Sequence, residues 1–278
     1  MNRIDSMFQR LRRKGEKGLI TFITACDPDP DVTERLVPAM ERAGADLIEL
    51  GVPFSDPMAD GPVIQRASQR ALERGTTLPE ILALVKRLRT RTEIPLVLMS
   101  YYNPVLQYGL GAFAAEAAAA GVDGLIVPDL PVEESGPLLE ETAKHGLDLI
   151  PFAAPTSTPE RLDRTAEVAR GFIYCVSLTG VTGMRRELPP HVEEFITRVR
   201  KHCAQPLAIG FGISNPEQAA RMAGLGDAVI VGSAIVNLVE QYQADPDLLV
   251  EKVGGLVRQI KEAITLSSSI RTIGQPTT

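Results

Sequence analysis

The chain has 278 residues, of which 44% are hydrophobic and 23% charged, a composition typical of a soluble globular protein with a sizeable core. Its 29 basic and 35 acidic residues give a net charge of −6, which argues against nucleic acid as a partner because phosphate backbones need a basic face. No apolar run is long enough to span a bilayer, so we expect no membrane association.

The N-terminal segment lacks the continuous apolar stretch of a secretory signal, although its arginines weakly resemble those of a transit peptide. Its apolar residues are instead spaced at i, i+3, i+4 and i+7: Ile4, Met7, Phe8 and Leu11. This spacing predicts a helix with one apolar face, which docks on the body of the protein. We therefore expect an extra N-terminal helix and a cytoplasmic protein.

The cysteines are Cys26, Cys175 and Cys203, an odd number spread along the chain. Two of them lie in apolar, strand-like runs, which favours reduced, buried thiols over disulfides. The three histidines share no metal-ligand spacing with each other or with the cysteines, so the sequence predicts no metal site.

Eight short apolar runs predict β-strands, and a helical pattern follows each of them: 19–25, 46–50, 96–99, 124–127, 147–151, 172–176, 207–209 and 228–231. Eight parallel βα units without a long linker predict an α/β protein with a closed (β/α)8 TIM barrel. An open doubly wound sheet is the alternative, but Cys26-Asp-Pro stands where such a sheet usually carries a Gly-rich fingerprint. We expect one barrel domain over 1–266 and a frayed C-terminal tail over 267–278.

Glu49 is an acidic residue near the end of an otherwise apolar strand, 46–50. If Ile48 and Leu50 face the surrounding helices, alternation turns Leu47 and Glu49 toward the barrel axis. The active site of such barrels lies at the C-terminal ends of the strands, so Glu49 would point into it. The alternative is a strand-end glutamate in water, because a one-residue slip reverses the faces.

Two more acids follow in the loop after this strand. Asp60 precedes Gly61-Pro62, where its side chain could cap the next helix or stabilise the turn that leads into it. It could also face Glu49 across a small pocket, and two acids in unlike environments can divide the work of moving a proton and holding a charge. Asp56, before Pro57, has the same capping alternative and a weaker claim to function.

Three late loops carry glycines that would let backbone N–H groups approach an anion: Thr182-Gly183, Gly210-Phe-Gly212 and Gly232-Ser233. A helix that begins near Ser233 would add its positive end. A single glycine can end a strand for steric reasons alone, but the joint position of these glycines predicts a phosphate site.

Four aromatic residues lie in or after predicted strands: Phe22, Tyr101, Tyr174 and Phe211. Each could be an ordinary core residue. If they face the mouth of the barrel together, they form an apolar pocket that suits a flat aromatic substrate.

The segment Glu49–Gln65 closely resembles the signature of the tryptophan synthase alpha chain family. Shorter segments resemble the same family in the same order and extend the likeness over nearly the whole chain: Tyr101–Pro104, Val127–Pro131, Gly180–Gly183, Gly210–Ser214 and Gly232–Ile235. The first segment is long and specific, whereas the short glycine motifs are weak when taken alone.

The resemblance implies a lyase of L-tryptophan biosynthesis, which cleaves indole-3-glycerol phosphate to indole and D-glyceraldehyde 3-phosphate. It implies that Glu49 is the general acid and base that protonates C3 of the indole ring. It implies that Asp60 lies beside the indole N–H and stabilises the positive charge there. Other roles are implied as follows: indole pocket, Phe22, Tyr101, Tyr174 and Phe211; phosphate site, Gly183, Gly212, Gly232 and Ser233; closing lid loop, Thr182.

The family also implies a partner, the tryptophan synthase beta chain, in an alpha2–beta2 heterotetramer. Pyridoxal phosphate is expected only in that beta chain, and no cofactor is expected in this one. The implied contact surface consists of Pro53–Asp56, Asn103–Tyr108 and Asp129–Glu133. The resemblance therefore assigns Asp56 to the contact with the partner and not to the active site.

Three other functions stay open at this point. A stand-alone lyase of the same family would release indole without a beta chain. An indole-glycerol-phosphate synthase relative would need a lysine on a barrel strand, and the first three predicted strands contain none. A non-catalytic regulatory subunit that binds phosphate is the third, and the presence of both Glu49 and Asp60 speaks against it.

Overall fold

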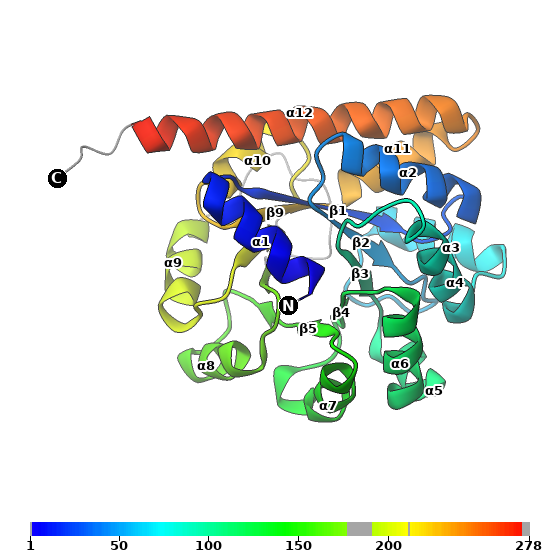
Figure 1. Cartoon of the computed structure of the whole chain (residues 1–278), viewed down its shortest axis with the longest axis horizontal. Coiled ribbons are helices and arrows are strands. Elements are labelled where there is room, and N and C mark those ends of the chain that lie inside the picture. Colours follow the sequence, from blue (N-terminus) through cyan, green and yellow to red (C-terminus); the bar gives the residue numbers. More distant parts are fainter. Residues whose placement is uncertain (1, 177–190, 211, 274–278) are drawn as a thin grey trace.

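In the computed structural model, a single parallel sheet forms a barrel at the centre of the molecule (Figure 1). The structure describes residues 2–176, 191–210 and 212–273, with side chains up to residue 267. The strands are β1 Gly18–Thr24, β2 Leu47–Gly51, β3 Leu96–Met99, β4 Gly124–Ile126, β5 Asp148–Ile150, β6 Phe152–Ala153, β7 Ile173–Val176, β8 Leu207–Gly210 and β9 Ala228–Val231. They pair in the order β5-β4-β3-β2-β1-β9-β8-β7-β6.

The first and last strands in this order, β5 and β6, lie where the sequence predicts a single strand over 147–151. The structure instead has two short strands there, β5 and β6, with Pro151 between them. β5 pairs with β4 and β6 pairs with β7, so one length of chain joins both ends of the sheet. Proline has no N–H to donate and interrupts the ladder, although its carbonyl accepts the N–H of Tyr174 at 3.0 Å. The predicted barrel is confirmed, with its fifth strand split in two.

Helices surround the barrel (Figure 1). They are α2 Pro30–Arg42, α3 Pro62–Glu73, α4 Leu78–Leu88, α5 Tyr102–Tyr108, α6 Leu110–Ala120, α7 Gly136–Lys144, α8 Pro159–Val168, α9 Val192–His202, α10 Pro216–Ala223 and α11 Ser233–Tyr242, with a 3-10 turn, η1, at Val132–Glu134. α5 begins at Tyr102, only three residues after the end of β3 at Met99. Pro104 lies in the first turn of this helix, where its missing N–H costs no hydrogen bond.

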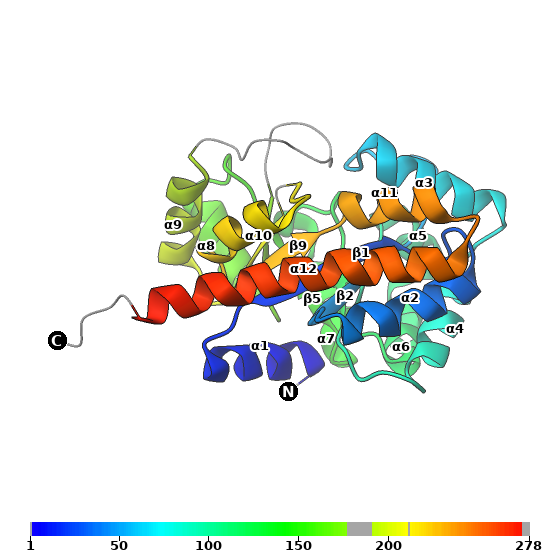
Figure 2. The ribbon, with the colours of Figure 1, turned by 90° about the horizontal axis from the view of Figure 1, so that it is seen from above.

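The first helix, α1 (Arg3–Lys14), closes the N-terminal end of the barrel and confirms the expected extra helix. Asn2 caps it, because its side-chain oxygen accepts the N–H groups of Ile4 and Asp5 at 2.9 and 3.1 Å. In Figure 2, α1 lies below the strands. Its predicted apolar face is buried in one cluster with the barrel interior: Ile4, Met7, Phe8 and Leu11.

Side chains alternate along β2 as the sequence predicts. Ile48 and Leu50 pack outward in the cluster shared with the helices, whereas Leu47 packs in the interior cluster. Glu49 is the next inward position along the strand, and its register partner on β1 is Phe22. Glu49 therefore lies above Leu47, toward the C-terminal ends of the strands.

Three aspartates pin neighbouring strands together at the N-terminal end of the barrel. The carboxylate of each accepts an N–H from the start of the preceding strand, at 2.8 to 2.9 Å: Asp46 from Leu19, Asp123 from Leu96, and Asp227 from Leu207. A basic side chain neutralises each carboxylate: Lys261, Arg89 and Arg200, respectively. These aspartate pins join β1 to β2, β3 to β4, and β8 to β9.

The last helix, α12 (Pro246–Ile273), lies along α10 and α2 and crosses one side of the molecule (Figure 1). The backbone of α12 continues to Ile273, into the segment 267–278 that is expected to be a frayed tail, and residues 274–278 lie outside the described residues, so the extent of the tail stays a prediction. Each added residue of an established helix gains a hydrogen bond, so a Ser/Thr-rich end can still propagate it. In the described part of the chain, no helix combines the length and the apolar composition needed to cross a membrane.

Candidate active site

Glu49 is completely buried, with none of its surface exposed to solvent. Within the described residues, neither oxygen of its carboxyl group has a hydrogen-bond partner. Burial, together with the nearby charge of Asp60, raises the pKa of this carboxyl group to about 8. Glu49 is therefore mostly protonated at neutral pH, so it has a proton to give to a bound molecule.

Asp60 lies in the loop between β2 and α3 and is 4% exposed. Burial raises the pKa of its carboxyl group to about 6, and a hydrogen bond from Tyr101 opposes that rise. Asp60 is thus mostly ionised at neutral pH, whereas Glu49 is mostly protonated. Gly61, not Asp60, is the N-cap of α3, and within the described residues Oδ1 of Asp60 has no hydrogen-bond partner, whereas Oδ2 accepts from Tyr101.

A short chain of hydrogen bonds holds Asp60 in place. The backbone N–H of Ala59 donates to the hydroxyl oxygen of Tyr101 at 2.9 Å, and that hydroxyl donates to Oδ2 of Asp60 at 3.1 Å. The ring of Tyr101 stacks on Phe54, with centroids 5.0 Å apart. Tyr101 thus has a polar role toward Asp60 that the sequence, which suggests only a pocket wall, does not reveal.

Phe22 and Tyr174 lie close to the two acids. Phe22 is buried on β1, beside Glu49 in the strand register. Tyr174, on β7, packs against the interior cluster of the barrel. Burial and then the charges of Glu49 and Asp60 raise the pKa of its hydroxyl well above its usual value. Phe211, the fourth predicted member of the pocket, lies outside the described residues.

Two glycines make room for these rings, a role that the sequence predictions do not give them, because Gly51 has no assigned role there and Gly210 appears only in a predicted phosphate loop. A Cβ atom on Gly51 would lie 2.5 Å from Cζ of Phe22, and one on Gly210 would lie 2.6 Å from Cε1 of Tyr174. Both glycines are the last residues of their strands, β2 and β8. A glycine inside a strand often marks such a close approach, and this signal could have found them.

The predicted phosphate residues fall partly within the described structure. Gly232 is the N-cap of α11 without a side-chain capping bond, and Ser233 is the buried first residue of that helix. Gly212 has a φ of +69°, a backbone conformation that favours glycine. Thr182 and Gly183 lie outside the described residues, so the lid and that part of the phosphate site stay predictions.

Exposed apolar side chains lie in and beside the predicted partner surface. Leu106, within this surface, is 48% exposed, and Met58, which lies two residues beyond the segment Pro53–Asp56, is 80% exposed. Asp56 is also exposed, and its carboxylate accepts the hydroxyl of Ser55 at 2.5 Å. Asp129, in the third predicted contact segment, accepts the backbone N–H of Tyr102, the residue just before the second segment, at 2.9 Å.

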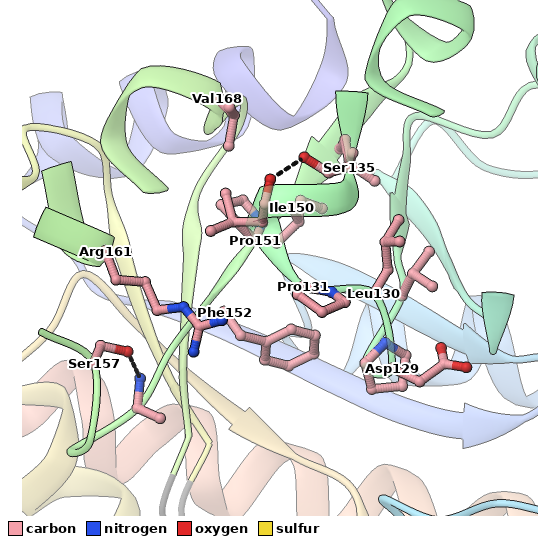
Figure 3. A pocket seen from close by; sticks show the side chains of 15 residues that line it. Asp129, Leu130, Pro131, Ser135, Ile150, Pro151, Phe152, Ser157, Arg161 and Val168 are labelled. Carbon is pink, nitrogen blue, oxygen red and sulfur yellow. Dashed lines mark hydrogen bonds between the residues drawn. The ribbon is translucent and has the colours of Figure 1, made fainter. Parts of the chain in front are cut away.

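A cavity of about 280 Å³ lies beside the junction of β5 and β6 and is also lined by the segments after β4 and β6 (Figure 3). Asp129, Phe152 and Arg161 are among its lining residues, and Arg161 is held by Glu133 through two hydrogen bonds at 2.8 and 3.0 Å. The ring of Phe152 also lies 5.0 Å from that of Tyr174, so the cavity adjoins the aromatic pocket. The sequence predictions do not include Phe152.

Comparison with known proteins decides the family. A model of the tryptophan synthase alpha chain family matches residues 8–265. The chain belongs to the tryptophan synthase alpha chain family.

Relatives in this family are similar over almost their full length. The tryptophan synthase alpha chain of Geotalea uraniireducens is 51% identical over 264 residues, which are 95% of this chain and 98% of the relative. That of Citrifermentans bemidjiense is 52% identical over 268 residues, or 96% and 100% of the two chains.

Solved structures of the tryptophan synthase alpha chain family share the fold. The tryptophan synthase subunit alpha of Legionella pneumophila has a TM-score of 0.88 and 41% identity, and covers 95% of this chain and 98% of its own. A chain of Mycobacterium tuberculosis tryptophan synthase has a TM-score of 0.87 and 37% identity, with coverage of 95% and 98%.

This membership confirms the resemblance found in the sequence. The chain is a tryptophan synthase alpha subunit of tryptophan biosynthesis, and its activity is that of a lyase that cleaves indole-3-glycerol phosphate. The comparisons do not favour the alternative functions. Within the described residues, no group of three or more His, Cys, Asp or Glu side chains is arranged to hold a metal ion.

Proposed function

We propose that Glu49 and Asp60 carry out the cleavage of indole-3-glycerol phosphate into indole and D-glyceraldehyde 3-phosphate. The observation that supports this assignment most is the difference between two neighbouring buried carboxyl groups, with pKa values raised to about 8 and about 6. Acids whose pKa values are pushed apart in this way can take different roles at one pH.

The reaction needs two proton transfers, both of which involve Glu49. Protonated Glu49 gives its proton to C3 of the indole ring, and the positive charge that forms at the ring nitrogen is stabilised by ionised Asp60 beside the N–H. The carboxylate of Glu49 then takes the proton of the hydroxyl group on the carbon attached to the ring. The carbon–carbon bond breaks, its electron pair returns to the ring, and an aldehyde forms, so no proton is gained or lost overall.

The remaining site residues bind the two halves of the substrate. Aromatic side chains enclose the indole ring: Phe22, Tyr101, Tyr174 and Phe211. Backbone N–H groups and a hydroxyl hold the phosphate: Gly183, Gly212, Gly232 and Ser233. The uncapped start of α11 supports this, because the first N–H groups of a helix attract anions. Thr182 belongs to a loop that closes over the substrate and excludes water.

The partner in this proposal is a tryptophan synthase beta chain in an alpha2–beta2 heterotetramer. Pyridoxal phosphate belongs to that beta chain, and this chain needs no cofactor for the proton transfers described above. The contact surface comprises Pro53–Asp56, Asn103–Tyr108 and Asp129–Glu133, and exposed Leu106 supports it. Such an enzyme would work in the cytoplasm.

The decisive experiment is indole release from indole-3-glycerol phosphate, with and without a beta chain. The substitution Glu49→Gln should lower turnover roughly a thousandfold, because it removes the proton donor. Binding of the substrate should change little, since glutamine matches the neutral, protonated glutamate in shape and charge. Near-normal turnover in Glu49→Gln would overturn the assignment. Full activity that a beta chain does not increase would instead favour a stand-alone lyase.

A further inference from the structure

Two helices that begin at the two halves of the proposed site meet on one aromatic ring. α3 begins two residues after Asp60, and α11 begins at Ser233. Figure 2 shows the two helices side by side. Beneath them, Phe22 packs in one cluster with Ile64 and Ala67 of α3 and with Val236 of α11.

Each helix start is connected directly to its half of the site. The side-chain amide of Gln65, in the first turn of α3, donates to the backbone carbonyl of Asp60 at 2.9 Å. On α11, a Cβ atom placed on Gly232 would lie 3.3 Å from Cβ of Phe22. A small rotation of one helix against the other would therefore move Asp60 relative to the phosphate residues.

A network of ion pairs joins the same two helices beyond the site. Arg66 of α3 binds Glu240 of α11 through two hydrogen bonds at 2.6 and 2.7 Å. Arg70, one turn later on α3, reaches the same carboxylate at 3.3 Å. Glu240 thus accepts from two guanidinium groups of the neighbouring helix.

Arg70 also anchors this network to the barrel. Its Nε and Nη2 atoms donate to the two carboxylate oxygens of Asp27, each at 2.8 Å. Asp27 is 2% exposed and follows β1, the strand that carries Phe22. Such a paired, planar geometry fixes orientation as well as distance, which a single lysine contact would not do.

We propose that Arg66, Arg70 and Glu240 are positioning residues that hold the indole half and the phosphate half of the site at a fixed separation. This inference rests on the proposed function, because it needs a substrate that spans both halves. The network touches no reacting atom. It sets the angle between α3 and α11, and so determines whether Asp60 and the phosphate residues contact one molecule at the same time.

A network that served only stability would have a different signature. It would lower the unfolding temperature when broken, but it would not distinguish between ligands that fill one half of the site and ligands that fill both. A positioning network predicts such a distinction. Each half of the site can follow its own helix and still bind its own fragment. A single molecule that must fill both halves at once binds less well when the two halves are misaligned.

The test compares three probes by calorimetry on Glu240→Gln: indole, glycerol 3-phosphate, and 3-(indol-3-yl)propyl phosphate, which combines both parts. We expect the dissociation constant of the combined probe to rise about fivefold, a typical coupling between sites, and those of the two fragments to change less than twofold. Equal changes for all three probes, or no change, would overturn the inference. Failure of wild-type chain to bind the combined probe would instead count against the proposed function.

The matched control is Glu34→Gln, which breaks an ion pair between α2 and α4, where Arg87 donates to Glu34 at 2.5 Å. It should leave the ratio between the three dissociation constants unchanged. If Glu240→Gln fails to fold, Arg66→Gln decides the question, because Arg66 is half exposed and its loss leaves the Arg70 contacts in place. Arg66→Gln should raise the dissociation constant of the combined probe more than those of the two fragments, but by less than Glu240→Gln does. Equal changes for all three probes, or no change, would refute the inference.

Discussion

The hydroxyl group of Tyr101 donates a hydrogen bond to Asp60 at 3.1 Å, although the two residues are 41 positions apart in the chain. This contact joins the loop after β3 to the loop after β2. It favours the ionised form of Asp60, because a donor stabilises a carboxylate more than a neutral carboxyl group. Tyr101 therefore helps to keep the two acids of the site in different protonation states.

Tyr101→Phe should shift the acidic side of the activity profile to higher pH. Loss of the donor raises the pKa of Asp60 above its present value of about 6, and activity that needs ionised Asp60 then appears at higher pH. We expect the acidic limb of kcat/KM against pH to move by about one pH unit. Tyr242→Phe, near the end of α11, makes the same chemical change away from the acids and should leave the limb unmoved.

Glu49→Gln should make the stability of the protein less dependent on pH. Glu49 has a folded-state pKa raised to about 8, so between its unfolded pKa and pH 8 the unfolded chain binds fewer protons than the native one. Wild-type stability attributable to this group is therefore complete below about pH 4 and falls as pH rises to about 8. The loss should be at most about 5 kcal/mol.

Urea unfolding of both proteins at pH 5 and pH 8 measures this effect. Glu49→Gln should gain stability relative to wild type as pH rises, because glutamine never acquires the buried charge. Glu262→Gln, at an exposed position on α12, controls for the loss of one acid. A constant difference between Glu49→Gln and wild type at the two pH values would contradict a raised pKa at Glu49.

Gly51→Ala should damage the indole pocket through Phe22. The added methyl group would lie 2.5 Å from Cζ of the ring, closer than real contacts allow, so the ring must move. We expect a loss of about 1–3 kcal/mol of stability and a higher dissociation constant for indole.

Thermal unfolding and calorimetry with indole measure the two effects of Gly51→Ala. Gly254→Ala on α12 is the matched control, since a Cβ atom there meets nothing within 4 Å. It should stabilise the helix by up to about 1 kcal/mol. Unchanged indole binding in Gly51→Ala would show that Phe22 does not line the pocket.

Gly232→Ala should weaken binding of the phosphate half more than that of the indole half. The new methyl group would lie 3.3 Å from Cβ of Phe22, and relief of this contact would displace Gly232, the N-cap of α11, and the backbone N–H groups that follow it. The dissociation constant for glycerol 3-phosphate should rise several-fold by calorimetry. Gly136→Ala, near the start of α7, places a methyl group in open space and should change nothing. Equal binding by Gly232→Ala and wild type would move the phosphate site elsewhere.

The sequence predicts the barrel and the inward face of Glu49 because both depend on local, periodic patterns. Short apolar runs alternate with helical patterns along the whole chain, and β2 repeats with a period of two. The split of the fifth strand is missed, since a single proline near the end of an apolar run does not show which neighbour loses a hydrogen bond.

The finer features of the site depend on contacts between distant segments. Asp60 resembles a helix cap in sequence, and only the approach of Tyr101 from the next βα unit gives it another partner. The close fit of Gly51 against Phe22 is likewise invisible until β1 and β2 are paired. Phe211, Gly183 and Thr182 lie outside the described residues, so their roles stay predictions from the resemblance.

Because the aspartate pins are unevenly distributed, some strands of the barrel resist local opening more than others. They tie β1 to β2 and β3 to β4, so the strands that carry Phe22 and Glu49 and lead to Tyr101 resist local opening. At Pro151 the sheet is joined by chain continuity across a break in the ladder, next to Phe152 and Tyr174. Local opening of the native barrel should therefore begin at Pro151, between β5 and β6. Such opening would separate Phe152 and Tyr174 while the distance between Glu49 and Asp60 stays the same. Ligand entry and proton transfer would therefore depend on different halves of one sheet.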